Sequence, residues 1–564
     1  MRASARPRPR GALDPVTVSI LWARLRSVVD EAAATLIRTS FSTIVREVHD
    51  MTQLLTDDRG RTLAQSAVST PGFVGTTAGG VRHFLERWGR DGWRPGDVAV
   101  TNDPWVVTGH LPDVTIVTPV FHRRRLVAFM ANTAHMTDIG GTYFGASTTE
   151  VFEEGLRIPP LKLVAAGRPV GAVWDVIRAN VRAPDQVLGD LRAQIAANAQ
   201  GAATISGILE DYGLPDLGGL ARVVHDASAR ALGRALAPVL DGTYHAQVTG
   251  DGYGEPFTVR LALTVRRGHL HFDFTGSSPQ QRAPINAVLQ YTRAYAAFTT
   301  KCAFVPGIPN NEGLLRRISV EAPPGTIVNA VEPAPVQSRH VLGMVLQGAV
   351  FAAFAQCAPA ATQADSGTPP PIITFYGTRP DGTPFLTFEF ANGGVGGKLA
   401  ADGRSTTAFP SNLASLPVEV LESIAPVLYQ EQRLIPDSGG VGLARGGLGQ
   451  RKTFRVLHPM MASLLLDRFH HPPGGVLGGG PGRRAEARFA DGRPVTMKSV
   501  LALQPGDVLT LESPGGGGYG DPAKRPDELV RRDLEEGYVT SWPGLDQASQ
   551  EEGAPWRARS ASPS

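Results

Sequence analysis

Residues 102–141 read NDPWVVTGHLPDVTIVTPVFHRRRLVAFMANTAHMTDIGG, and they contain two strand-like segments around a short basic turn. The first segment, Val114–Phe121, alternates apolar and polar residues, and the second, Leu126–Met136, is almost continuously apolar. Two such segments joined by a tight turn predict an antiparallel hairpin. We expect Phe121 to pair with Leu126 across the turn.

In that register His135 falls opposite Pro112, between His110 and Asp113. One end of the hairpin would then gather two imidazoles and a carboxylate, with Asp138 just beyond them. Three nitrogen and oxygen ligands that leave open positions are what a catalytic metal–water site requires. Such ligands suit Zn, Mn or Fe(II) and argue against a metal selected by thiolates. The alternative is that these residues are turn caps and surface polar groups, and the residues alone leave both interpretations open.

The rest of the chain predicts a mixed α+β fold. Asp14 and Pro15 begin an amphipathic helix over residues 15–39. Residues 41–50 and 53–56 resemble a strand pair, and residues 241–300 alternate as antiparallel strands do. Further helices are expected at 79–89, 185–209, 217–240 and 341–357, and further strands within 370–512.

We therefore predict a largely antiparallel β architecture with a helical insert and a Gly-rich C-terminal half. Its expected parts are a disordered basic tail (1–13), a metal-site domain (14–182), a helical segment (183–240), a β-rich region (241–542) and a disordered tail (543–564).

Charge and composition exclude several classes of protein. The 55 basic and 52 acidic residues give a net charge of +3, too balanced for nucleic acid to be the main partner. Two cysteines are too few for a disulfide framework or a thiolate zinc site, so buried free thiols are expected. No apolar run approaches the roughly 20 residues of a membrane helix. The Arg-rich start lacks the apolar core of a secretory signal, so we expect a cytoplasmic protein.

Ordered motifs over about residues 14–540 resemble the hydantoinase B/oxoprolinase family. These motifs are residues 14–17, 46–50, 102–113, 134–141, 154–160, 329–335 with Arg339, 416–422, 437–449 and 513–522. Two positions depart from the family pattern: Phe73 stands where many members have a histidine, and Val107-Thr108-Gly109 replaces a common Gly-Gly-Thr. Both departures concern the identity of the substrate more than metal binding.

The resemblance implies an ATP-dependent hydrolase that opens a cyclic amide such as a hydantoin, N-methylhydantoin, 5-oxoproline or a lactam. A hydantoinase A-like partner would use ATP and Mg to phosphorylate the carbonyl oxygen, which makes a hetero-oligomer the expected state. Consistent with this, the chain contains no Gly-x-x-x-x-Gly-Lys-Ser/Thr motif of its own. The implied ligands of one divalent metal are Asp50, His110, Asp113 and His135.

Four further residues are candidates for supporting roles. Asp138 is expected to orient a ligand or act as the general base, with Glu47 as a second candidate base. Arg339 is a candidate to bind a carboxylate or phosphate, with a structural ion pair as the equal alternative. Arg445 lies among glycines that could hold an anion, although tight turns also explain that segment. Two other functions stay open: an acetone carboxylase-like α subunit, and a non-catalytic assembly protein.

Overall fold

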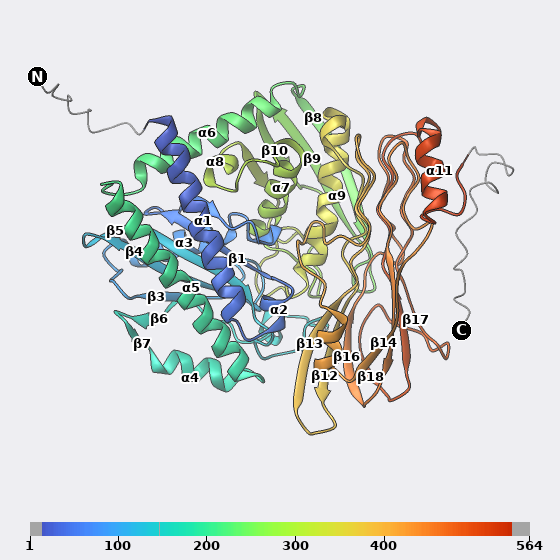
Figure 1. Cartoon of the computed structure of the whole chain (residues 1–564), viewed down its shortest axis with the longest axis horizontal. Coiled ribbons are helices and arrows are strands. Elements are labelled where there is room, and N and C mark those ends of the chain that lie inside the picture. The colour runs from blue at the N-terminus through green and yellow to red at the C-terminus, as the bar shows by residue number, and fades with distance from the viewer. Residues whose placement is uncertain (1–13, 146, 544–564) are drawn as a thin grey trace, which may run out of the picture.

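The computed structural model describes residues 14–145 and 147–543, and its architecture is α+β, as predicted (Figure 1). The first predicted tail lies outside the described residues, and so does the second apart from Pro543. An antiparallel seven-stranded sheet of order β2-β1-β5-β4-β3-β6-β7 carries the predicted metal-site segment. Its strands are β1 (Met51–Asp57), β2 (Thr62–Gln65), β3 (Val98–Thr101), β4 (Asp113–His122), β5 (Arg125–His135), β6 (Leu161–Ala165) and β7 (Arg168–Pro169).

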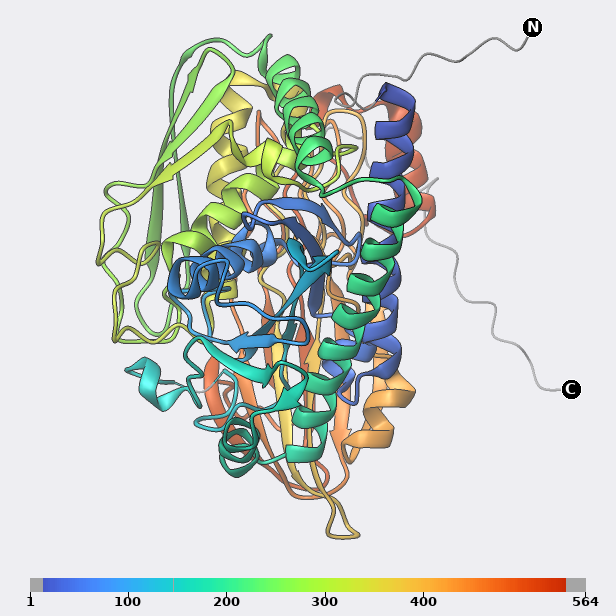
Figure 2. The same ribbon diagram turned by 90° about the vertical axis from the view of Figure 1, so that its left-hand side faces the viewer.

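Helices cover both faces of this sheet. The helices α1 (Pro15–Thr39) and α5 (Pro184–Asp211) run side by side over one face, and α6 (Gly218–Leu236) extends that layer (Figures 1 and 2). Helix α3 (Thr76–Trp88) packs on the other face. On β5, Met130 belongs to the core beneath α1 and α5, while its neighbour Phe129 belongs to the core beneath α3. Because successive strand residues point to opposite faces, both faces of β5 are buried.

The predicted hairpin is present as β4 and β5, but its register differs by one residue from the prediction. Phe121 pairs with Leu126 as expected, and a register shift follows between Val120 and Phe121. Asp113, and not Pro112, therefore lies directly opposite His135. The prediction was wrong at this point because one unpaired residue at a bulge displaces every later pair.

The segment before β1 is also not the predicted strand. Residues 43–46 form the one-turn helix α2 (Thr43–Arg46), and β1 pairs with β2 and β5 instead. His49 adopts a positive φ of 63°, which extended strands do not allow. This turn directs the chain into β1 immediately after Asp50.

A second sheet of order β11-β10-β9-β8 packs against α9 (Arg339–Cys357), which lies between the N-terminal elements and the C-terminal strands (Figure 1). Residues 241–300 were predicted as strands throughout, but their last part begins α7 (Leu289–Phe304). No apolar run of membrane-spanning length was predicted from the sequence, but among the described helices α9 alone is long and apolar enough to cross a membrane. Of its 18-residue apolar stretch, 72% is buried within the protein. Cys302 and Cys357 are free, as expected, but they are half-buried where full burial was predicted. The strands are β8 (Gly242–Gly250), β9 (Phe257–Arg266), β10 (His269–Asp273) and β11 (Ile318–Glu321).

Two four-stranded antiparallel sheets form the C-terminal part, with the orders β13-β12-β16-β18 and β14-β15-β19-β17. Their strands are β12 (Ile372–Thr378), β13 (Pro384–Phe390), β14 (Val427–Leu434), β15 (Gln450–Val456), β16 (Met460–Leu465), β17 (Glu486–Phe489), β18 (Lys498–Leu503) and β19 (Val508–Glu512). The remaining helices are α4 (Gly171–Asn180), α8 (Glu312–Leu315), α10 (Val418–Ile424), α11 (Asp527–Glu535), and the 3-10 turns η1 (Pro71–Phe73), η2 (Val151–Glu153), η3 (Pro359–Ala361) and η4 (Pro522–Lys524). One hydrophobic cluster includes Leu36, Val259 and Leu465, so the core crosses the predicted domain boundary at 240/241. The division into domains stays a prediction.

The Gly-rich C-terminal sequence forms a bundle of extended segments packed backbone to backbone. The N–H of Gly516 donates to Gly447, whose own N–H donates to Val395. The carbonyl of Gly516 in turn accepts from Gly440. At this separation there is no room for a side chain, because a Cβ at Gly516 would collide with the Val395 carbonyl. Glycine is therefore a steric requirement of this bundle.

We expect Gly516→Ala to lower the free energy of unfolding by about 1–3 kcal/mol or more, because backbone atoms cannot move aside as side chains do. Gly474→Ala is the matched control in the same bundle, since a Cβ there meets no heavy atom within 4 Å. Urea unfolding of both variants measures the difference. Equal stabilities would show that the bundle is loosely packed.

Candidate active site

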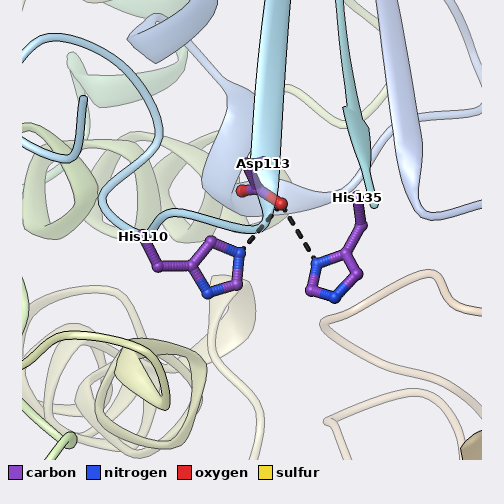
Figure 3. A group of neighbouring side chains, drawn as sticks. All are labelled: His110, Asp113 and His135. Carbon is purple, nitrogen blue, oxygen red and sulfur yellow. Dashed lines mark hydrogen bonds and ion pairs between the residues drawn. The ribbon is translucent and has the colours of Figure 1, made fainter. Parts of the chain in front are cut away.

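The end of the β4–β5 hairpin brings His110, Asp113 and His135 together, as the sequence predicted (Figure 3). One ligand atom from each residue lies within 4.8 Å of the others. Oδ1 of Asp113 is 2.8 Å from Nε2 of His110 and 3.2 Å from Nδ1 of His135. All three side chains are almost completely buried. This separation and donor set fit one divalent metal ion.

The tautomer of His110 also fits a metal ligand. Its Nδ1 lies 2.8 Å from the carbonyl oxygen of Gln337, which can only accept, so Nδ1 carries the proton. Burial, aided by the charge of Arg339, lowers the pKa of His110 to about 4, so the ring is neutral near pH 7. Nε2 then presents a lone pair towards the Asp113 carboxylate and has no hydrogen-bond partner there. Two facing lone pairs repel each other unless a cation lies between them.

Arg339 holds the second oxygen of Asp113. Its Nη2 donates to Asp113 Oδ2, its Nε donates to the Thr108 carbonyl at 2.5 Å, and its guanidinium lies 4.2 Å from the Tyr291 ring centre. Burial alone would raise the pKa of Asp113, but the positive charge of the neighbouring Arg339 holds that pKa well below its usual range. Asp113 therefore stays ionised, with one oxygen on the arginine and the other directed at the two imidazoles.

Asp50, the fourth predicted ligand, reaches the cluster from the residue preceding β1. Its Oδ2 is 3.7 Å from Nδ1 of His135. Burial raises the pKa of Asp50 to about 6, while the nearby His135 opposes that rise. Asp50 is thus mostly ionised near pH 7 and lies beside the cluster, where it can complete the coordination of an ion.

The four residues line a cavity of about 60 Å³. Its polar side includes Arg339 and the hydroxyl-bearing rings of Tyr291 and Tyr295, and its other side is aromatic and aliphatic. Phe144 and Phe388 lie edge-on to His135, with ring centres at 5.4 and 6.1 Å. Sequence reasoning missed all four of these rings. The four-residue spacing of the tyrosines is a helical signal, but it lay in a segment predicted as strand.

Glu154 was also missed, although it lies in one of the family motifs. Its Oε1 accepts from the backbone N–H groups of Val336 (2.7 Å) and Gln337 (2.8 Å) and from the Thr148 hydroxyl (3.1 Å). Glu154 thereby fixes the turn whose carbonyl orients His110. Burial raises the pKa of this carboxyl to about 8.

We expect Glu154→Gln to gain stability relative to the wild type as pH rises. The folded carboxyl keeps its proton up to about pH 8, whereas the unfolded one loses it near pH 4.5. The wild type therefore loses stability across that window, by on the order of 4 kcal/mol, and the uncharged variant does not. Urea unfolding at pH 5 and pH 8.5 measures this, with the exposed neighbour Glu153→Gln as the control. Parallel pH profiles for wild type and Glu154→Gln would contradict the prediction.

Three other predicted residues are not among those lining the cavity. Asp138 accepts from the backbone N–H of Gly140 and forms an ion pair with Arg182, and it lines a smaller neighbouring hollow. Glu47 is partly exposed and pairs with Arg46. Their predicted roles in the reaction stay predictions.

The third, Arg445, is buried elsewhere, in the glycine bundle. Its Nε donates to Asp533 at 3.2 Å and its Nη1 donates to the Gly446 carbonyl at 2.7 Å. The guanidinium also lies 5.1 Å from the Tyr538 ring centre. An anion bound by Arg445 would therefore have to compete with the Asp533 carboxylate for the guanidinium group.

Comparison with known proteins places the whole chain among relatives. The family model described as hydantoinase B/oxoprolinase matches residues 14–522. A putative D-/L-hydantoinase subunit of Pseudomonas sp. (strain NS671) is 31% identical over 556 residues, which cover 94% of this chain and 93% of that protein. The crystal structure of ATP-dependent caprolactamase from Pseudomonas jessenii has a TM-score of 0.87 at 29% identity and covers 96% of this chain and 100% of that one. Nucleotide-free acetone carboxylase shares the fold, with a TM-score of 0.84 at 19% identity over 96% of this chain and 82% of that one.

Proposed function

Because this chain belongs to the hydantoinase B/oxoprolinase family, we propose that it is the metal-binding subunit of an ATP-dependent enzyme that hydrolyses a cyclic amide. A relative of nearly equal length is described as a putative hydantoinase subunit, and a structural relative is an ATP-dependent caprolactamase. The observation that carries the proposal is the convergence of His110 Nε2, His135 Nδ1 and Asp113 Oδ1 in a buried cavity.

These three residues and Asp50 would hold one Zn, Mn or Fe ion. A divalent metal in this position supplies a Lewis acid that brings the pKa of water towards neutrality. The chain's own residues prepare the site for it. Gln337 keeps the proton on Nδ1 of His110, and Arg339 keeps Asp113 ionised and in place.

Arg339 also fits a role towards the substrate. A guanidinium has five N–H groups, and among the described residues its hydrogen bonds use Nε and Nη2. The N–H groups of Nη1 remain for a phosphoryl or amide oxygen beside the metal ligands. The Phe144 and Phe388 rings limit water around this point, which strengthens each charge interaction within the cavity.

The phosphorylation step is assigned to a partner chain that binds ATP and Mg. This chain has no Walker A motif, so a hydantoinase A-like chain would transfer the γ-phosphoryl group to the carbonyl oxygen of the cyclic amide. At the cavity around His110 and His135, water would then add to the phosphorylated carbonyl carbon and the ring C–N bond would break, with the nitrogen leaving as an amine. Hydrolysis of the resulting acyl phosphate by a second water would release phosphate and a linear acid. The working enzyme is accordingly a hetero-oligomer.

The test is to co-produce this chain with the ATP-binding chain and measure ring opening and ATP hydrolysis on a panel of lactams and hydantoins. Ring opening that requires both chains, ATP and a divalent metal supports the proposal. ATP turnover that depends on bicarbonate and a ketone would indicate carboxylation instead. If the partner is fully active in the absence of this chain, then this chain is a non-catalytic assembly protein.

A further inference from the structure

The cavity beside the metal ligands has one charged side and one side without charge. The charged side is formed by Asp50, Asp113 and Arg339, together with the imidazoles. The other side is mostly apolar and includes Phe73, Phe144, Met344, Ile372, Phe388 and Phe390. Thr70 and Ser411 also line the cavity, but their hydroxyl groups carry no charge. Phe144, Phe388 and Phe390 form a continuous aromatic surface, with ring centres 5.7 and 6.5 Å apart, that begins at His135.

Among the described residues that line the cavity, Arg339 is the one side chain with a permanent positive charge. Part of its hydrogen-bonding capacity is already used within the protein. It pairs with Asp113 and donates to Thr108, which leaves N–H groups for a single further anion. His340 also lines the cavity, but burial lowers its pKa well below the usual range, so it supplies no charge near pH 7. The two remaining charged groups, Asp50 and Asp113, are carboxylates that would hold the proposed metal, so they offer an anion no partner.

We infer that the ring accepted by this site carries no ionised substituent and lies against the aromatic surface. The inference rests on the proposed function and narrows its substrate class to uncharged cyclic amides. In the proposed reaction the phosphoryl group is already one anion, and it takes the metal side and Arg339. A second anion on the ring would face Phe73, Phe144, Phe388 and Phe390 with no positively charged partner, and burying a carboxylate without a cation is strongly unfavourable.

Phe73 is the residue through which this selectivity can best be altered. It lies on the 3-10 turn η1, is buried against the cavity, and is not in a strand that carries a predicted ligand. Phe144 and Phe388, in contrast, contact the His135 ring, so changing them would disturb the metal ligands as well. A cation at position 73 would supply the missing partner for a substrate carboxylate.

The first experiment compares 2-pyrrolidinone with 5-oxoproline, which differ only by a carboxylate, using the co-produced complex. The uncharged amide of 5-oxoproline separates the effect of charge from that of size. We expect kcat/KM for 2-pyrrolidinone to exceed that for 5-oxoproline by roughly a hundredfold or more, with the amide close to 2-pyrrolidinone. The pair hydantoin and hydantoin-5-acetic acid repeats the comparison on a second ring.

The second experiment measures the ratio of kcat/KM for 2-pyrrolidinone to kcat/KM for 5-oxoproline in Phe73→Arg. Phe298→Arg is the matched control. Phe298 lines an outer groove beyond η1 and not the metal cavity. We expect Phe73→Arg to shift the ratio at least tenfold towards the carboxylate substrate and Phe298→Arg to leave it unchanged. Because the ratio compares two substrates on one protein, a loss of folded protein cancels.

The outcomes separate the inference from the proposed function. Equal turnover of the charged and uncharged partners, or preference for 5-oxoproline by the wild type, overturns the inference and leaves cyclic amide hydrolysis intact. No turnover of any ring in the panel by the complex overturns the proposed function, and the inference with it. A wild-type preference for the uncharged rings that Phe73→Arg relaxes supports both.

Discussion

Replacing His110 by alanine is expected to remove the bound metal and to lower kcat for ring opening by roughly a thousandfold or more, since metal polarisation is worth several kcal/mol. The physical reason is geometric. Nε2 of His110 is one of three donor atoms that lie within 4.8 Å of one another, so the substitution removes one ligand of the cluster outright. Asp113→Ala should have the same effect on metal content.

Elemental analysis of the purified chain, with and without the substitutions, measures the metal directly and does not depend on the partner chain. His225→Ala is the matched control, because His225 is equally buried but lies outside the metal cavity. Its Nε2 donates to the Thr62 carbonyl at 2.8 Å, and its Nδ1 lies 3.5 Å from Arg316. That variant should lose stability and keep its metal. A wild type that contains no metal and still opens rings with its partner would contradict the metal-based mechanism.

Arg339→Ala is expected to lower the free energy of unfolding of the metal-free chain by about 3–5 kcal/mol, because it leaves the buried Asp113 carboxylate without its partner. In the metal-loaded complex, kcat/KM should fall as well. Arg339→Lys keeps the charge but loses the fork geometry and the stacking over Tyr291, so it should recover only part of either loss.

Arg445→Ala provides the comparison, since Arg445 also forms a buried ion pair, with Asp533. Because Arg525 would still hold Asp533 at 2.7 Å, Arg445→Ala should lose less stability than Arg339→Ala, and kcat/KM measured per folded molecule separates the two arginines. A fall in kcat/KM for Arg339→Ala alone would place Arg339 in the reaction, through its hold on Asp113, through anion binding or through both. An equal fall for both variants would support the predicted anion-binding role of Arg445, and no fall for either would leave both arginines as structural ion pairs.

Local sequence was sufficient for the parts of the fold that depend on nearby residues. Asp14 caps α1 as its position before a proline predicts, since Oδ1 accepts from the N–H groups of Val16 and Thr17. The helices α5 and α6 follow from periodicity, and the hairpin follows from two apolar segments and a short turn. Because adjacent strands share one register, the meeting of His110, Asp113 and His135 could be predicted from residues at most 25 positions apart.

Only the tertiary structure decided the surroundings of that cluster. Arg339 reaches Asp113 from 226 residues further along the chain, and Glu154 fixes Gln337 across 183 residues. The Phe388 ring reaches His135 from a C-terminal sheet that no local pattern links to the hairpin. Contacts of this kind depend on how whole layers pack, and spacing within a segment carries no information about them.

The difference between local sequence and tertiary packing also explains where the predictions were wrong and why the C-terminal glycines are needed. The bulge at Val120 moved Asp113 opposite His135, and a positive φ at His49 ended the predicted strand before Asp50. Tight turns were one explanation for the glycines around Arg445, whereas the structure uses residues such as Gly516 to let backbones touch. Hydrophobic periodicity and strand register are properties of a segment and could be predicted from its residues. Backbone contact, cavity shape and the pairing of buried charges are properties of the packed molecule, because each is set by atoms distant in the chain.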